Sequence, residues 1–227
     1  MPLKGRGIIT AGQLDFLRAF SSLEDSGHFY LTGGTALAEF YLGHRRSFDL
    51  DLFTAEQGLV LPFSRSLEQK LQGRFELKVV RRFETFVELE ASRSGEEIKV
   101  QLAFDSPFRF EEPVESDAGV RVNDFKDLSV DKCLALYGRA EPRDAVDLFF
   151  ILKTVGFDTI SDLAGQKDPG FDLYWLAVAL KKVEEYPDDI REWPVEMLAN
   201  ADAREIKEFF LALGRKVMRD IDSSRTR

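Results

Sequence analysis

Two aspartates separated by one residue, Asp49 and Asp51, are the part of this sequence best suited to chemistry. Acidic and apolar residues largely alternate over residues 49–54, which predicts a β-strand. Residues two apart on a strand face the same side, so both carboxylates would project together while Leu50 and Leu52 face a core. Like charges on one strand face repel unless a cation joins them, and magnesium prefers carboxylate and phosphate oxygens. The pair therefore predicts a Mg²⁺ (or Mn²⁺) site, with a solvent-facing edge strand as the alternative.

A glycine pair precedes the aspartates at a point where the chain is expected to turn. The apolar run over residues 28–32 predicts a strand, and residues 35–42 predict a helix that ends at Gly43. Gly33 and Gly34 between them allow a sharp turn and close approach of a ligand. The N-terminus of the helix that follows suits a phosphate group. Gly33, Gly34 and Thr35 are therefore predicted to bind nucleotide phosphates, and an ordinary strand-to-helix turn is the alternative.

A short polar segment, residues 44–47, links this helix to the acidic strand. A guanidinium at Arg45 could orient a carboxylate or bind a phosphate. Arg45 and Ser47 are therefore assigned to the nucleotide site, whereas His44 and Arg46 are expected to be loop residues.

The elements that would position these residues belong to two parts of the chain. The first part is expected to be mixed, with helices at 11–25 and 62–73, strands at 75–82, 84–92 and 96–104, and an extended stretch over 105–125 with a short strand near 120–122. Ser94-Gly95 suits a hairpin turn. The second part is expected to be helical, at 127–138, 143–155, 158–165, 171–186 and 203–222. The prediction is an α+β fold, with a mixed sheet and flanking helices over residues 1–125 and a helical domain over residues 126–227.

Composition limits the classes of protein to which the chain can belong. It has 227 residues, of which 44% are hydrophobic, and a single cysteine, Cys133, so it forms no internal disulfide and fits a reducing compartment. A net charge of −9 argues against broad binding to a nucleic-acid backbone but not against a small nucleotide site. There is no signal-peptide pattern and no run of roughly 18 apolar residues. We expect a cytoplasmic protein that does not associate with membranes.

The order strand, Gly-Gly turn, helix and paired-acid strand resembles the DNA polymerase β-like nucleotidyltransferases. Within that superfamily, the segment LTGGTALAEFYLGHRRSFDLDLF is similar to the AbiEii/AbiGii toxin family. A second block, LSVDKCLALYGRAEPRDAVDLFFIL over residues 128–152, resembles the same family in the same order. The resemblance covers about residues 10–155 and implies a nucleotidyltransferase fold.

The resemblance also implies roles for the second block. Lys132 is expected to contact the triphosphate, and Asp144, with Asp147 ranked behind it, is expected to be functional. From the residues alone, Lys132 lies off an apolar helix face formed by Val130, Cys133, Leu134 and Tyr137. Asp144 in a first helical turn is also explained by the helix dipole, whereas Asp147 is expected to be partly buried beside a cationic partner. The predicted catalytic residues are Asp49, Asp51, Lys132 and Asp144, and Asp147 is added to the nucleotide site.

One position departs from the superfamily pattern. Such enzymes often carry a third carboxylate on a later strand as the general base, and the position expected to hold it is Gln101. An amide cannot accept a proton at neutral pH and is a weaker metal ligand than a carboxylate. Asp105 lies four residues further on, roughly 13 Å along an extended strand, and Glu97 is displaced equally in the other direction.

Three functional hypotheses follow from these features. The first is a metal-dependent nucleotidyltransferase that moves a nucleoside monophosphate from a nucleoside triphosphate to a hydroxyl of RNA (tRNA) or protein, as a toxin with a cognate antitoxin partner. The second, favoured by Gln101, is a catalytically weakened module that binds a nucleotide or a partner protein. The third is a small-molecule nucleotidyltransferase resembling those that modify aminoglycosides.

Overall fold

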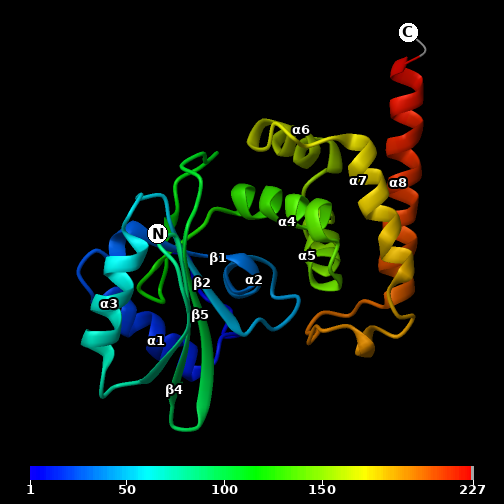
Figure 1. The fold of residues 1–227 in the computed structure, drawn as a ribbon. Helices are drawn as coiled ribbons and strands as arrows, with labels where there is room; N and C mark the ends of the chain where they lie inside the picture. The colour runs from blue at the N-terminus through cyan, green and yellow to red at the C-terminus, as the bar shows by residue number, and fades with distance from the viewer. Residues whose placement is uncertain (226–227) are drawn as a thin grey trace. The chain divides into compact units, whose positions relative to one another are not determined.

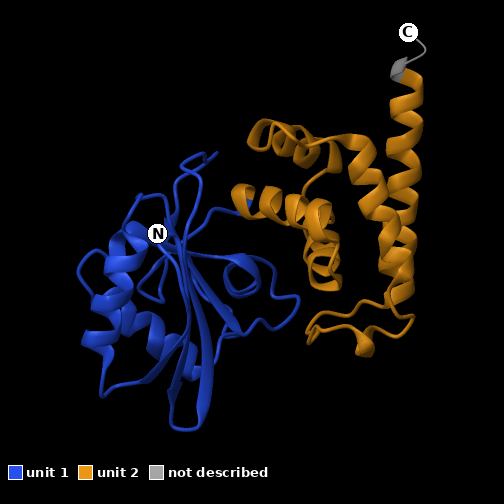
Figure 2. Ribbon diagram, viewed as in Figure 1, with its two compact units in different colours: residues 1–125 blue, residues 126–227 orange. Residues whose placement is uncertain are grey.

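The computed structural model describes residues 1–225, and the side chains of residues 1–223. The chain divides into two compact units, Met1–Phe125 and Lys126–Arg227 (Figure 2). The division falls where the predicted strands give way to predicted helices.

The first unit is built on a seven-stranded mixed sheet in the order β3-β4-β5-β2-β1-β7-β6. The strand that carries the acid pair, β2, pairs in parallel with β5 on one side and antiparallel with β1 on the other. It therefore lies inside the sheet, and the edge-strand alternative is wrong. The strands are β1 (Phe29–Thr32), β2 (Asp49–Thr54), β3 (Glu76–Arg82), β4 (Phe86–Arg93), β5 (Glu96–Phe104), β6 (Val114–Glu115) and β7 (Arg121–Val122).

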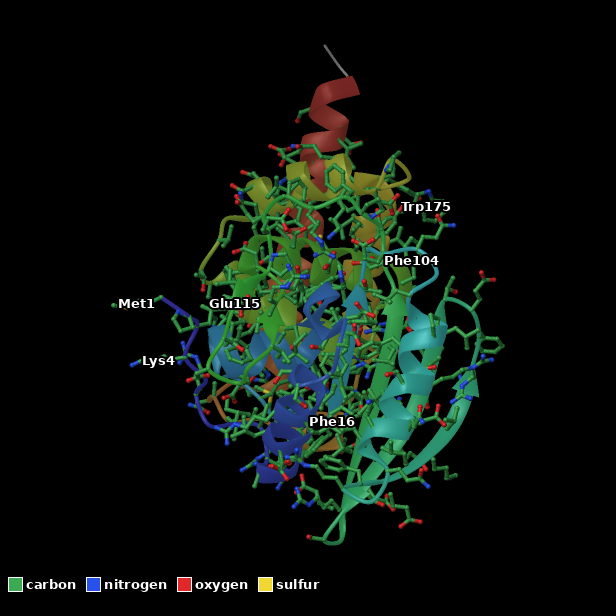
Figure 3. All side chains as sticks on the ribbon, turned by 90° about the vertical axis from the view of Figure 1, so that its left-hand side faces the viewer. Met1, Lys4, Phe16, Phe104, Glu115 and Trp175 are labelled. Atoms are coloured by element: carbon green, nitrogen blue, oxygen red, sulfur yellow. The ribbon has the colours of Figure 1, made fainter. Side chains whose placement is uncertain are left out.

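Helices cover the sheet on both faces (Figure 1). Helices α1 (Ala11–Ser21) and α3 (Val60–Leu71) pack on one face, and α2 (Gly33–Ala36), which continues as a π-helical segment over Leu37–Leu42, lies on the other. Between α1, β1 and α3, the rings of Phe20, Phe29 and Phe63 pack in edge-to-face and tilted contacts at centroid distances of 4.4–5.8 Å. Phe16, labelled in Figure 3, is fully buried beside them on α1. Burying such side chains stabilises the folded state by about 1.5–3 kcal/mol each. This stabilisation keeps the face of β2 that carries Leu50 and Leu52 inside the unit.

Local sequence signals explain several boundaries. Thr10 and Gln13 form a capping box at the start of α1, in which each side chain accepts from the other residue's backbone N–H. Ser94 and Gly95 both adopt positive φ angles, 54° and 84°, as a two-residue hairpin turn between β4 and β5 requires. The helix predicted at 35–42 begins two residues earlier than expected, at Gly33, and ends at Gly43 with φ 68°.

The second unit is helical. It contains α4 (Phe125–Arg139, which begins at the unit boundary), α5 (Pro142–Leu152), α6 (Phe157–Lys167), α7 (Leu173–Lys182) and α8 (Ala203–Arg225), with short 3-10 turns at Val183–Glu185 and Ile190–Glu192. None of the described helices combines the length and apolarity needed to cross a bilayer.

The predicted apolar face of α4 is wrong in detail. Val130 and Cys133 are buried as expected, but Leu134 and Tyr137 are only half-buried, and Leu128 and Leu136 take their place in the core. Lys132 lies on the buried side of the helix, with only 7% of the residue exposed. A charged side chain can be buried there because acidic partners on α5 reach it, as described below.

Candidate active site

Asp49 and Asp51 project from the same face of β2, as the alternation predicts. Leu50 and Leu52 between them are fully buried, whereas both aspartates are half-exposed. The carboxylates thus stand on the face that carries α2, at the centre of the sheet rather than at its margin. Two neighbouring carboxylates that remain accessible to solvent can supply oxygen ligands to a cation.

The glycine turn meets the acid pair directly. Gly33 has φ +70°, and a Cβ atom built on it would overlap the Asp51 carboxylate. A Cβ on Gly34 would overlap the Arg45 guanidinium and would lie 2.9 Å from Ser47 Oγ. Any larger residue at either position would therefore displace a side chain of the site. The turn consequently needs both glycines for space, and Gly33 also for its backbone conformation.

Hydrogen bonds to backbone carbonyls fix the segments around Thr35, Arg45 and Ser47. The Thr35 hydroxyl donates to the carbonyl oxygen of Asp49, so it ties α2 to the acidic strand. Arg45 is buried, and its guanidinium donates to the Arg46 carbonyl at 2.9 Å. The amide of Gln13, on α1, donates to the Ser47 and Phe48 carbonyls at 3.3 and 3.0 Å, which fixes the segment before β2. Seven predicted residues thus come together in the first unit: Gly33, Gly34, Thr35, Arg45, Ser47, Asp49 and Asp51.

Gln101, the residue expected at the position of a third acid, lies next to the acid pair in the sheet. In the parallel β2–β5 pair, Asp51 lies beside Gln101 and Asp49 lies beside Lys99. In the orientation that satisfies both of its ends, the Gln101 amide donates to Asp51 Oδ1 at 3.3 Å and accepts from Lys99 Nζ at 3.1 Å. A neutral side chain therefore links Asp51 to a lysine at this position.

Lys99 and Glu88 are residues of this face that sequence reasoning missed. Glu88, on β4, lies beside Gln101 in the antiparallel β4–β5 register and is only 14% exposed at its side chain. Lys99 Nζ lies 3.9 Å from Asp49 Oδ2 and 4.0 Å from Glu88 Oε1. The alternation of residues 97, 99 and 101 could have put Lys99 and Gln101 on one face, but their position beside the acid pair depends on which strands are neighbours.

Asp105 contacts other residues than the acid pair. Its carboxylate accepts from the Tyr30 hydroxyl at 2.7 Å and lies 3.5 Å from the Arg109 guanidinium, which stacks on the Tyr30 ring at 3.8 Å. Burial and the negative charge of Asp105 raise the pKa of Tyr30 above its usual value, which keeps its hydroxyl a donor. Asn123 extends this network, because it accepts from Arg109 at 2.9 Å and donates to Thr32 Oγ1, next to Gly33, at 3.1 Å.

The second unit contains a buried ionic cluster formed by the second block of predicted residues. Lys132 Nζ lies 2.7 Å from Asp147 Oδ2 and 3.7 Å from Asp144 Oδ1, and both aspartates are fully buried. Arg139 donates two hydrogen bonds to Asp144, at 2.7 and 2.9 Å. Asp147 is thus more deeply buried than predicted and is the closer partner of Lys132. Asp144 joins Lys132 to an arginine at the end of α4.

Cys133 is adjacent to Lys132 in sequence, but it faces apolar surroundings. The thiol is fully buried, and burial raises its pKa to about 12. A thiol that stays protonated and inaccessible is a poor nucleophile, so it is a core residue.

The donor set of the first unit fits a divalent cation that shares its coordination with a phosphate. Asp49 and Asp51 supply carboxylate oxygens, and Asp49 is one-third exposed at its side chain. The absence of a side chain at Gly33 leaves the space that the Asp51 carboxylate occupies. Among the described residues, no three His, Cys, Asp or Glu side chains form a metal site by themselves.

A mixed sheet with a Gly-Gly turn facing two aspartates on a central strand defines a nucleotidyltransferase fold. Comparison with known proteins agrees. The model of the family described as "Nucleotidyl transferase AbiEii toxin, Type IV TA system" matches residues 15–220. The chain therefore belongs to the AbiEii family of nucleotidyltransferase toxins. The match also includes most of the C-terminal helices, which extends the resemblance well beyond residue 155.

Solved structures share the fold at low sequence identity. JHP933 from Helicobacter pylori aligns with a TM-score of 0.57 and 15% identity over 95% of this chain and 93% of JHP933. MenT4, a nucleotidyltransferase toxin from Mycobacterium tuberculosis H37Rv, aligns with a TM-score of 0.53 and 20% identity over 76% of this chain and 63% of MenT4. A comparison with curated protein sequences finds no match.

Proposed function

We propose that this protein transfers a nucleoside monophosphate from a nucleoside triphosphate to a hydroxyl acceptor and that it acts as the toxin of a toxin–antitoxin pair. The single observation that carries the proposal is the contact of Gly33 with Asp51, beside Asp49 on the same face of β2. A turn that needs glycine beside an accessible carboxylate pair suits a triphosphate and a metal better than it suits a purely structural strand.

The residues of the first unit have separate roles in this reaction. Asp49 and Asp51 hold Mg²⁺ (or Mn²⁺), which when bound neutralises charge on the triphosphate and on the pyrophosphate that leaves. The Gly33-Gly34 turn and the first N–H groups of α2 bind phosphate oxygens. The acceptor oxygen forms a bond to the α-phosphorus, the bond from that phosphorus to the bridging oxygen of pyrophosphate breaks, and the hydroxyl proton passes to a carboxylate of this face or to water. Positioning and charge neutralisation supply most of the catalysis.

Lys132 and Asp144 are proposed as the second set of groups that transfer requires. Support comes from the family membership, the burial of the cluster and the contacts that hold the Lys132 ammonium between Asp144 and Asp147. The acceptor is proposed to be RNA, with tRNA first, or a protein. The family description names a type IV toxin–antitoxin system, which supports an antitoxin partner.

The test uses purified protein, each of the four α-labelled nucleoside triphosphates, Mg²⁺, total tRNA and cell extract. Label that enters RNA or protein with the wild type, but not with the Asp49→Ala/Asp51→Ala double variant, supports the proposal and identifies the acceptor class. A Lys78→Gln variant, which removes an exposed cross-strand pair with Glu90, serves as the control and is expected to keep full activity. Label that enters equally with the double variant would refute the role of the acid pair.

A binding module without transfer is the second candidate, because the residue beside Asp51 on β5 is the amide Gln101 and not a carboxylate. It predicts metal-dependent binding of a nucleoside triphosphate with no labelled product. Equilibrium dialysis of the wild type with each nucleotide and Mg²⁺, run beside the transfer assay, separates the two functions.

A further inference from the structure

Lys99 lies at the centre of a row of charged residues, Asp49, Lys99 and Glu88. The row crosses three strands on the sheet face that carries Asp49 and Asp51. Its ammonium lies within 4.0 Å of a carboxylate on β2 and of a carboxylate on β4, those of Asp49 and Glu88. The Gln101 oxygen on its own strand accepts from it at 3.1 Å. A positive charge that is 41% exposed at its side chain thus lies among oxygen atoms from three neighbouring strands, where a metal ion could otherwise be attracted.

This arrangement changes what the acid pair can bind. A second divalent cation beside Asp49 would gain no carboxylate from β5 at the position beside Asp51, because the residue there is a neutral amide. It would also lie close to the Lys99 ammonium, and like charges at such short range repel strongly. The oxygens that remain on Asp49 and Asp51, with those of a triphosphate, suit one divalent ion.

We propose that the Lys99 ammonium takes the place of a second divalent cation, so that this nucleotidyltransferase site works with a single metal ion. Glu88 is a positioning residue, because its carboxylate lies 4.0 Å from the Lys99 ammonium on the side away from β2. The inference rests on the proposed function, since it assumes that Asp49 and Asp51 bind a metal with a nucleotide.

The experiment counts Mn²⁺ bound per chain. The full-length protein is dialysed to equilibrium against Mn²⁺ and an α,β-methylene nucleoside triphosphate, with each of the four bases in turn, and bound Mn²⁺ and nucleotide are measured together. The wild type is expected to hold one Mn²⁺ per bound nucleotide. The Lys99→Gln/Gln101→Glu double variant, which removes the ammonium and restores a carboxylate, is expected to hold two. Gln101→Glu alone, which keeps Lys99, is expected to hold one.

Matched variants separate this role from folding. Lys78→Gln removes a lysine–glutamate pair of the neighbouring β3–β4 strands and is expected to behave as the wild type. Glu88→Gln is expected to raise Mn²⁺ binding above one per nucleotide when it is combined with Gln101→Glu. In the transfer assay, Lys99→Gln is expected to lower the rate by about 100-fold while the nucleotide affinity stays within about twofold.

The outcomes distinguish the inference from the proposed function. Two Mn²⁺ per nucleotide in the wild type, or one in a double variant that keeps its thermal unfolding transition, would overturn the single-ion site and leave the proposed function standing. Neither Mn²⁺ nor nucleotide bound to the wild type would overturn the proposed function, and the inference with it.

Discussion

Replacing Gly33 with alanine should separate the backbone strain of the glycine turn from its effect on Asp51. Gly33 has φ +70°, a conformation that costs an L-residue roughly 1–2 kcal/mol. Alanine also restricts the unfolded chain, which offsets about 0.4–1 kcal/mol of that cost. The net loss of unfolding free energy is therefore about 1 kcal/mol, or about 2–4 °C in Tm. In addition, the new Cβ would overlap the Asp51 carboxylate, so the side chain must move.

Gly58 provides a matched control. It has φ +79°, and a Cβ built on it would meet nothing within 4 Å. Gly58→Ala should therefore lose about the same 1 kcal/mol as Gly33→Ala, because both pay for the same left-handed backbone. Only Gly33→Ala should weaken Mn²⁺–nucleotide binding, by about 10–100-fold, as do other changes that reorient a metal ligand.

Thermal unfolding and equilibrium dialysis, run on the same three proteins, check both parts. If Gly33→Ala binds Mn²⁺ and nucleotide as tightly as the wild type while its Tm falls, the turn constrains the backbone but does not position Asp51 for a ligand. If both variants lose binding equally, global destabilisation explains the result and the reasoning is refuted.

Three further predictions concern stability. Asp147→Ala should lower the unfolding free energy by roughly 3–5 kcal/mol in urea titrations, because it leaves the Lys132 charge buried without its nearest partner. Lys153→Met, which breaks an exposed ion pair, should change the unfolding free energy by at most about 1 kcal/mol. The Cys133 thiol keeps its proton in the folded protein, where its pKa is about 12, compared with 9.0 in the unfolded chain. Its contribution to the unfolding free energy is therefore fully present below pH 9 and is lost as the pH rises. When the pH is raised from about 8 to about 10.5, the unfolding free energy of the wild type should therefore fall by roughly 2 kcal/mol more than that of Cys133→Ala. Equal decreases would contradict this prediction. Thr10→Ala should cost about 1 kcal/mol through loss of the α1 cap, measured by the same titration.

The acidic strand was predictable because its signal is local. The alternation of acids and leucines defined β2 at Asp49–Thr54, and burial of Leu50 and Leu52 defined its inner face. The Ser94-Gly95 hairpin was predictable for the same reason, since two residues with positive φ angles close it. Signals of this kind depend only on neighbours in sequence.

The buried side of α4 was not predictable from periodicity. A lysine among apolar residues normally marks the solvent face of a helix, and on that rule Lys132 was expected to lie off the apolar face. It is buried because Asp144 and Asp147, on the next helix, compensate its charge. The helical pattern of residues 125–139 does not contain that information, which resides in the packing of α4 against α5.

The row formed by Asp49, Lys99 and Glu88 required the sheet order. These residues are up to fifty positions apart in sequence, and they meet because β5 inserts between β2 and β4. Gln101 on its own reads as a lost catalytic acid. Beside Lys99, the same amide is a neutral link that accepts from the ammonium and donates to Asp51. Gln101 and Lys99 are in direct contact, so the effect of a change at either position should be interpreted together with the other.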